Sequence, residues 1–384
     1  MMLSLKKRGR ILVILTSVLM LFLLRPYFVW GFALNKYINF LVSGILGLIF
    51  YSQIEINKSK SLQLLAAYFI ALVTIYSFKN GANIIGFVTT LFVVFVPFVR
   101  DSFRKDVYET FSTVFVILVG ISLLIWGGVI LGVVSPIGTI TPIDSTKDIT
   151  YIVYPFCVTQ GLDFRFYGPF DEPGVVGTLC GMLLFCERHN LKSYKAILLI
   201  LYGLFSLSMF FYLVLLVILI MNSLFENHYR HPSVIFLTLF IILFLSTNNN
   251  SFMYDTIWRR LEWDWEEMSF KGDDRMSEDA DFYFQQIKGT SAFWFGVSDK
   301  AAYLENVEGS SSYKNVIATH GAILFGAYVL FFILYGLKYR QTNTAYILYL
   351  FVMLGTIYQR PSLFSFVWLF LFTYMARDKY SENL

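Results

Sequence analysis

The chain has 384 residues, of which 57% are hydrophobic and only 15% are charged, and its mean hydropathy is +0.63. A soluble protein of this size carries about 25% charged residues, so the composition excludes an ordinary soluble enzyme. The formal net charge of +4 is modest and gives no reason to expect a nucleic-acid partner. The three cysteines, Cys157, Cys180 and Cys186, form no CxxC pair and predict neither a disulfide framework nor a zinc site.

Apolar stretches recur along the whole chain and lack the alternation that is typical of outer-membrane strands. Helices are the remaining way to satisfy every backbone polar group in lipid. The sequence therefore predicts an all-α polytopic integral membrane protein with a single transmembrane domain over residues 1–384. About 12 transmembrane helices are expected, at 11–30, 36–51, 62–78, 82–99, 109–134, 170–186, 194–207, 208–222, 233–247, 315–337, 344–358 and 362–376.

Two of these segments need a decision. The N-terminal "KKRGR" and the apolar run after it resemble a signal peptide, but no small-x-small cleavage site follows, so we expect a retained first span. Residues 195–222 are too long for one span and short for two, and we divide them at "SLS", residues 206–208.

Positive charge predicts the orientation of the spans. With a cytoplasmic N-terminus, 17 Lys and Arg residues fall on the inside: Lys6, Lys7, Arg8, Arg10, Lys58, Lys60, Arg100, Arg104, Lys105, Arg188, Lys192, Lys195, Arg230, Lys338, Arg340, Arg377 and Lys379. The short outer turns carry only Arg25, Lys36, Lys79 and Arg360. Both termini are therefore expected in the cytoplasm, and two long loops, 135–169 and 248–314, are expected outside.

The first outer loop ends in "RFYGPFDEPGVVG", residues 165–177, directly before an apolar run. Pro173 suits the first position of a helix because its missing N–H would be unpaired there. Glu172 is then expected at the N-cap and Asp171 just outside it. Acids at this position complement the helix dipole, which is a purely structural explanation of the two carboxylates.

That explanation does not use Arg165 or the glycines Gly168 and Gly174. Glycines allow the backbone to approach a bulky ligand, and Arg165 offers a planar fork to a phosphate. A neighbouring carboxylate can accept a proton from a hydroxyl group. A ligand-binding interpretation therefore accounts for the whole motif.

The second outer loop, 248–314, is the most polar part of the chain and predicts two short helices. "SEDADFYFQQIKG", 277–289, has Ser277 as a cap, Gly289 as its end, and Ala280, Phe284 and Ile287 on one face. The second candidate is 254–268, with three tryptophans among charges. We expect both to lie flat at the membrane interface.

Three arginines of this loop, Arg259, Arg260 and Arg275, are either salt-bridged surface residues or, with Arg165, a phosphate-binding mouth. The "DAD" at 279–281 resembles a metal-binding DxD, but on a helix its carboxylates point about 200° apart. Further along, His320 falls about two turns inside the span predicted at 315–337, where a lone histidine is more often packed than catalytic. Arg360 lies at another outer helix end, where an arginine can also snorkel.

The pattern R-x-Y-G-x-F-x-E-P-G at 165–174 resembles a signature of the bacterial O-antigen polymerase family. Arg275, "FWFGVS", "SSSYKNVIATHG" and Gly321 resemble features of that family's later outer loop. The related O-antigen ligases usually carry a histidine eleven residues before this glycine, where the present chain has Ser310. That difference favours the polymerases.

The resemblance implies a metal-independent glycosyltransferase of the inner membrane, which polymerises undecaprenyl-pyrophosphate-linked oligosaccharide repeat units at the periplasmic face. Arg165 and Arg275 are expected to hold the pyrophosphate, and Glu172, or secondly Asp171, to act as the base. Further substrate-binding candidates are Arg259, Arg260, Arg360, Tyr313, Trp258, Trp263, Trp265 and His320. No cofactor or metal is expected. The expected partners are the lipid-linked oligosaccharide, membrane lipid and a chain-length regulator protein.

Three alternatives remain open: an O-antigen ligase, a flippase for the lipid-linked oligosaccharide, and a structural membrane partner of a synthase complex. Flippases favour internal repeats and charges at mid-bilayer depth. The sequence has no obvious repeat and places its charges in the outer loops.

Overall fold

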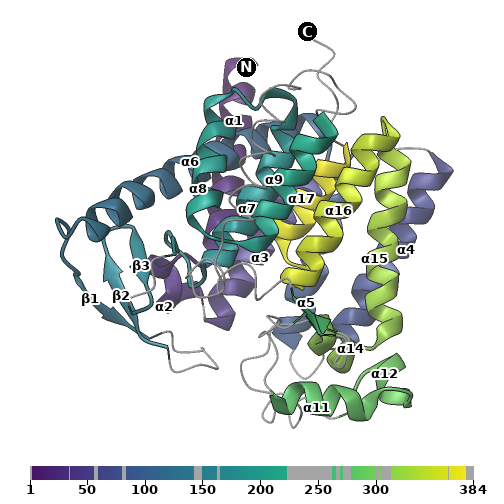
Figure 1. The fold of residues 1–384 in the computed structure, drawn as a ribbon. Coiled ribbons are helices and arrows are strands. Elements are labelled where there is room, and N and C mark those ends of the chain that lie inside the picture. Colours follow the sequence, from purple (N-terminus) through teal and green to yellow (C-terminus); the bar gives the residue numbers. More distant parts are fainter. Residues whose placement is uncertain are drawn as a thin grey trace.

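The computed structural model of the chain describes residues 2–33, 35–55, 59–79, 84–141, 149–161, 165–222, 262–264, 269–270, 278–298, 303, 313–361 and 363–377. Most of these residues form helices that run side by side, with a small sheet at one edge and short helices at one end (Figure 1). We call the end where α1 begins and α17 ends the upper end, as drawn in Figure 1. The opposite end, which carries β1–β3, α11 and α12, is the lower end.

The elements of the lengthwise bundle are α1 (Met2–Leu23), α3 (Lys36–Ser52), α4 (Lys60–Lys79), α5 (Ile84–Leu91), η2 (Phe92–Phe98), α6 (Asp101–Ile130), α7 (Pro173–Cys186), α8 (Tyr194–Phe205), α9 (Met209–Met221), α15 (Ala322–Tyr339), α16 (Asn343–Gln359) and α17 (Phe366–Arg377). The shorter elements are η1 (Tyr27–Val29), α2 (Trp30–Ala33), η3 (Arg188–Asn190), α11 (Glu278–Ile287), α12 (Ser291–Phe295) and α14 (Tyr313–His320). The strands are β1 (Gly138–Ile140), β2 (Tyr151–Tyr154), β3 (Cys157–Thr159), β4 (Trp263–Asp264) and β5 (Ser269–Phe270).

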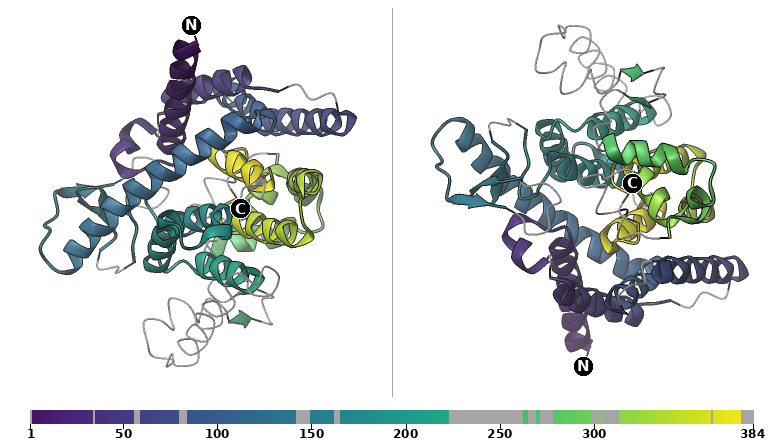
Figure 2. Two further views of the ribbon diagram at one scale, coloured as in Figure 1. Left: turned by 90° about the horizontal axis from the view of Figure 1, so that it is seen from above. Right: turned by 90° about the horizontal axis from the view of Figure 1, so that it is seen from below.

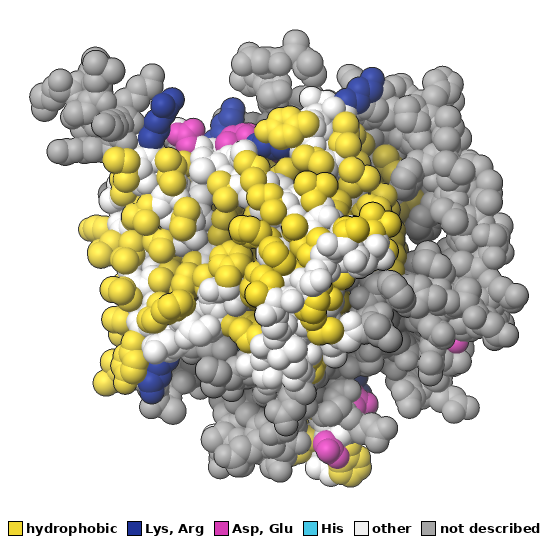
Figure 3. Space-filling view, turned by 90° about the vertical axis from the view of Figure 1, so that its left-hand side faces the viewer, with side chains coloured by type: hydrophobic (Ala, Val, Ile, Leu, Met, Phe, Trp, Pro, Cys, Tyr) yellow, Lys and Arg dark blue, Asp and Glu magenta, His cyan; other side chains and the backbone are white. Residues whose placement is uncertain are grey.

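Three of the described helices, α4, α6 and α15, are long and apolar enough to cross a membrane unaided. Other apolar helices are shorter, and the predicted count of about twelve spans is not confirmed. Large hydrophobic side chains nevertheless cover the outside of the bundle, among them Ile84, Leu124 and Leu64, with exposed fractions of 81%, 79% and 72%. One face shows a broad hydrophobic band with charged side chains along its upper rim (Figure 3). This surface indicates association with a membrane.

Several predicted boundaries are confirmed and others are wrong. The division at 206–208 is right, because α8 ends at Phe205 and α9 begins at Met209. The span predicted at 11–30 ends early, since α1 stops at Leu23 and Arg25 has a φ of 55°. The span predicted at 315–337 is broken into α14 and α15 at Gly321, which has a φ of 91°. The segment 233–247 lies outside the described residues.

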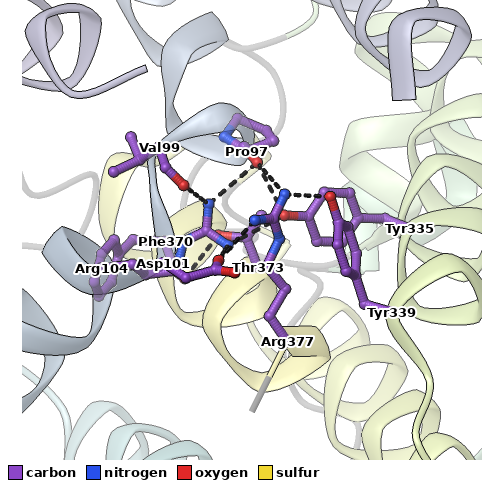
Figure 4. A network of polar contacts seen from close by, with 9 residues as sticks. All are labelled: Pro97, Val99, Asp101, Arg104, Tyr335, Tyr339, Phe370, Thr373 and Arg377. Atoms are coloured by element: carbon purple, nitrogen blue, oxygen red, sulfur yellow. Dashed lines mark hydrogen bonds and ion pairs between the residues drawn. The ribbon is translucent and has the colours of Figure 1, made fainter. Parts of the chain in front are cut away.

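The upper end of the bundle is tied together by two arginines (Figure 4). The turn η2 ends beside Pro97, so the carbonyls there have no partner within a helix. Arg104, which is 1% exposed, and Arg377 donate to these carbonyls and join α6 and α17 to η2. The bonds are Arg104 Nη2 to Val99 O (2.7 Å) and Pro97 O (3.2 Å), Arg377 Nη2 to Pro97 O (3.3 Å), Arg377 Nη1 to Asp101 Oδ1 (2.7 Å) and Tyr335 Oη to Pro97 O (2.9 Å).

The first outer loop contains a three-stranded antiparallel sheet in the order β1-β2-β3, so the prediction of a purely helical protein is wrong here. Gly138 pairs with Val153 across β1 and β2, and Val153 pairs with Val158 across β2 and β3. Seen from below, the sheet lies beside the outer part of α6 (Figure 2). A small buried cluster joins it to α2 and to the loop before α7: Trp30, Tyr151, Val158 and Tyr167.

The helix predicted at 277–289 is present as α11, and Gly289 follows it with a φ of 78°. Its predicted apolar face, Ala280, Phe284 and Ile287, packs against Ile317 and Ala318 of α14 and so builds a small core. This face is therefore covered by α14, and the location of α11 at the membrane interface stays a prediction. In the described part of 254–268, Trp263 lies in strand β4, so the predicted helix is wrong at this point.

Candidate functional site: an acid pair at the mouth of α7

The segment 165–172 is fixed by the elements around it. Its aromatic side chains Phe166, Tyr167 and Phe170 are buried. Three backbone hydrogen bonds connect it to other elements: Val158 N–H to Gly168 O (3.0 Å), Tyr27 N–H to Pro169 O (2.7 Å) and Phe166 N–H to Phe205 O (3.0 Å). Gly168 has a φ of 58°, a conformation that glycine adopts without strain. The segment therefore presents its last two residues, the acids, from a rigid support.

Pro173 is the first residue of α7 and Glu172 is its N-cap residue, as predicted. The Glu172 side chain makes no capping hydrogen bond. Its Oε2 instead forms an ion pair with Nη2 of Arg360, which follows the end of α16. Capping alone is therefore an incomplete account of this acid, because Glu172 joins the mouth of α7 to the lower end of α16.

Gly174 makes this approach possible. A Cβ atom at Gly174 would lie 2.8 Å from Nη2 of Arg360 and 3.5 Å from Nε2 of Gln359. Only a glycine leaves room for the guanidinium group over the first turn of α7. The prediction that a glycine permits close approach is confirmed at Gly174, where the approaching group in the structure is Arg360.

Asp171 lies next to this ion pair, and its pKa is raised. The largest cause is desolvation by the surrounding protein, although the residue is exposed to solvent. The charge of Glu172 raises the pKa further, whereas the charges of Arg360 and Arg25 lower it. We call Asp171, Glu172 and Arg360, with the nearby Arg25 and Tyr151, the acid-pair site.

Arg25 and Tyr151 are the members that sequence reasoning missed. Arg25 lies in the turn after α1, and its carbonyl accepts a hydrogen bond from Trp30 Nε1 (2.8 Å). Tyr151, on β2, is 5% exposed, and its pKa is raised by burial and by the charges of Asp171 and Glu172. Arg25 had a signal in the sequence, since it is a basic residue on the side predicted to be poor in positive charge. Tyr151 had none.

Arg165 lies over the aromatic ring of Tyr167. Its guanidinium carbon lies 6.0 Å from the ring centre of Tyr167, which belongs to the same buried cluster as Tyr151. The Tyr167 hydroxyl donates to Gln160 Oε1 (3.3 Å). Arg165 is therefore connected to the acid-pair site through the buried cluster that contains both Tyr167 and Tyr151.

Helix α14, which follows the loop predicted at 248–314, lies beside α16. The ring of Tyr313, at the start of α14, lies 5.5 Å from that of Tyr358, two residues before Arg360. At the other end of α14, His320 stacks on Tyr76 with ring centres 4.5 Å apart, and its Nδ1 lies 2.7 Å from Thr319 Oγ1. The structure thus places Tyr313 next to α16 and His320 in an aromatic stack against α4.

The end of α14 is clamped by Lys79. Its ammonium group donates to the carbonyl oxygens of His320 (3.0 Å) and Phe295, which end α14 and α12. A cation is favourable at a helix C-terminus. The segments that follow α12 and α14 cross here at Gly296 and Gly321. A Cβ on Gly321 would lie 2.3 Å from Trp294 O. This clamp holds α14 between α4 and α16.

Five predicted site residues, Arg259, Arg260, Arg275, Trp258 and Trp265, lie outside the described residues, and Trp263 is described only as part of β4. The convergence of Arg165 with Arg275 stays a prediction. Of the DxD-like pair, Asp281 forms an ion pair with Lys314 (2.6 Å). Within the described ranges, no three His, Cys, Asp or Glu side chains gather as metal ligands would.

The arrangement offers a carboxylate with a raised pKa beside a second carboxylate and two arginines, at the lower end of an apolar bundle. Such a group can accept a proton from a hydroxyl group and hold an anion nearby. Comparisons of the chain with family models, with curated proteins and with solved structures found no match.

Proposed function

We propose that this protein is a metal-independent glycosyltransferase of the bacterial inner membrane, which polymerises undecaprenyl-pyrophosphate-linked oligosaccharide repeat units. The single observation that carries the proposal is the acid-pair site: Asp171, with its raised pKa, beside the Glu172–Arg360 ion pair. The resemblance of residues 165–174 to the O-antigen polymerases supplies the substrate class. The apolar surface of the bundle supports the membrane location.

The proposed orientation follows the distribution of positive charge. The upper end, with Arg104, Lys105 and Arg377, would face the cytoplasm, and the acid-pair site would face the periplasm. A lipid carrier in the outer leaflet would then bring its pyrophosphate to the depth of the lower helix ends. Nucleotide sugars remain in the cytoplasm, so a donor already attached to its lipid fits this geometry.

In the proposed reaction, an acceptor hydroxyl oxygen attacks the anomeric carbon of the donor sugar. The bond from that carbon to the pyrophosphate oxygen breaks, and the pyrophosphate keeps the electron pair. Arg360 and Arg25, with Arg165 and Arg275 as predicted, stabilise the charge that the leaving group gains. The hydroxyl proton passes to a carboxylate of the site.

We assign the base to Asp171 in preference to Glu172. The Glu172 carboxylate is already engaged by Arg360. Asp171 has a pKa above its usual value, and a base is most effective when its pKa lies near the working pH. Glu172 then holds Arg360 in position beside the reacting groups.

The test is incubation of the purified protein in lipid nanodiscs with a synthetic lipid-linked repeat unit, followed by gel analysis. A ladder of products without added nucleotide is expected, and Asp171→Asn should abolish it. Asp279→Asn, which changes an exposed acid on α11, serves as the matched control and should keep the ladder. If the substrate stays unpolymerised with the wild-type protein, the proposal fails, and transfer to a lipid A core instead would identify a ligase.

A further inference from the structure

A second candidate site lies at the other end of the molecule, in a crevice between α1 and α6. The two helices cross (Figure 2) and touch where Ser17 Oγ donates to Val107 O (3.3 Å). Beside this contact lies a cavity of ≈ 720 Å³. Its lining residues are Gly9, Arg10, Val13, Ile14, Asp106, Glu109 and Thr110. This volume is within the range of ligand-binding pockets, about 300–1,000 Å³.

The two walls of the crevice carry opposite charges, and the structure describes no ion pair between them. Arg10 lies on the α1 wall and Asp106 on the α6 wall, and within the described part of the chain neither has an ion-pair partner. The other acid, Glu109, is balanced by Lys195, whose Nζ lies 2.7 Å from Glu109 Oε2. The crevice therefore exposes one positive and one negative group, held apart on separate helices.

The rest of the lining is apolar or small. Val13 is buried and Ile14, one of the exposed hydrophobic residues of α1, faces outward. Nothing lies within 4 Å of a Cβ on Gly9, so the crevice is open at this point. A ligand that fits has a separated positive and negative charge at one end and a hydrocarbon chain at the other.

We propose that this crevice binds a phospholipid with a primary-amine headgroup. The ammonium group would donate to the carboxylate of Asp106, the phosphate would accept from Arg10, and an acyl chain would lie along Val13 and Ile14. The carboxylate of Asp106 repels an anionic lipid headgroup, whereas Glu109 is already balanced by Lys195. A quaternary amine has no N–H to donate, so the carboxylate also favours a primary amine over choline. The inference requires only membrane association and is independent of the proposed enzymatic function.

Native mass spectrometry of delipidated protein tests this directly. Phosphatidylethanolamine, phosphatidylcholine and phosphatidylglycerol with identical acyl chains are added in equal amounts. We expect the ethanolamine lipid to bind about five- to tenfold more tightly than the choline lipid, as one charge-assisted hydrogen bond provides. Asp106→Asn should bring this ratio close to one.

Two controls complete the experiment. Glu55→Gln removes an exposed acid outside the crevice lining and should leave the ratio unchanged. Gly9→Leu fills the open side of the crevice and should weaken binding of all three lipids. A wild-type ratio near one, an equal or higher affinity for phosphatidylglycerol, or an unchanged ratio in Asp106→Asn would overturn the inference.

Discussion

The substitution Gly174→Ala should disturb the acid-pair site without destabilising the helix bundle. The new Cβ would lie 2.8 Å from Nη2 of Arg360, whereas ordinary contacts of a Cβ are 3.4–4 Å. The guanidinium group must move away by about 0.6 Å to restore an ordinary contact. Because Arg360 is the tip of a flexible side chain, it can yield without a backbone shift. The substitution should therefore pull Arg360 away from Glu172 and leave α7 intact.

The expected change in stability is small. The Glu172 side chain is 50% exposed, and an ion pair this open to water contributes about 0–1 kcal/mol. Alanine in place of glycine stabilises a helix interior by up to about 1 kcal/mol, and by less in the first turn. The two effects offset each other, so we expect the melting temperature to change by no more than about 3 °C. Activity should fall roughly tenfold or more, since misplacing a catalytic group by about 1 Å can cost a hundredfold.

The assay pairs polymer length in cells with the melting temperature of the purified protein. Gly181→Ala, on the same helix, is the matched control, because its Cβ would meet Phe210 and Val214 at an ordinary 3.6 Å. It should leave the chain length unchanged and raise the melting temperature slightly, because alanine favours the helix interior and meets no clash there. Normal chain length in Gly174→Ala would refute the claim that the position of Arg360 matters for the reaction. A melting temperature lowered by 10 °C or more would show that Arg360 has a structural role instead.

Three further predictions follow from the same geometry. The positive charge of Arg25 lowers the pKa of Asp171, so Arg25→Gln should raise that pKa. Because the base works only when ionised, the acidic limb of the pH–activity profile should move to higher pH, and an unmoved limb contradicts the assignment. Gly321→Ala should destabilise the protein more than Gly289→Ala, as read from melting temperatures, because both have positive φ but only Gly321 is blocked by backbone atoms. Lys79→Met should loosen α14, seen as faster proteolysis of the second outer loop, and unchanged cleavage would argue against the clamp.

The parts of the fold that were predictable are those set by local chemistry. The start of α7 at Pro173 follows from the fixed φ and missing N–H of proline. The face of α11 that carries Phe284 follows from helical periodicity, although the sequence did not show that its partner would be α14. The break at Gly321 was missed because apolar residues lie on both sides of it, at 316–318 and 322–325, and only the crossing with Gly296 requires a glycine there.

The parts that were missed depend on contacts between distant segments. Glu172 and Arg360 are separated by 188 residues, and no local pattern reports such a pairing. The strands β1 to β3 are three or four residues long, too short to produce a clear alternation. Tyr151 became part of the site only because β2 brings it beside the acids. The motif at 165–174 thus indicated where a site lies but could not supply its partners.

The exceptions to the predicted charge distribution are the most informative residues of this sequence. A basic residue on the outer side opposes the preferred orientation of a membrane protein, so it should persist only where a local interaction compensates. Of the four predicted exceptions, Arg360 pairs with the mouth of α7, Arg25 influences Asp171, and Lys79 clamps two helix ends. Lys36 contacts an exposed tyrosine ring beside it on α3. Three of the four exceptions therefore make contacts between separate elements of the structure, and these positions are where substitutions should most affect function.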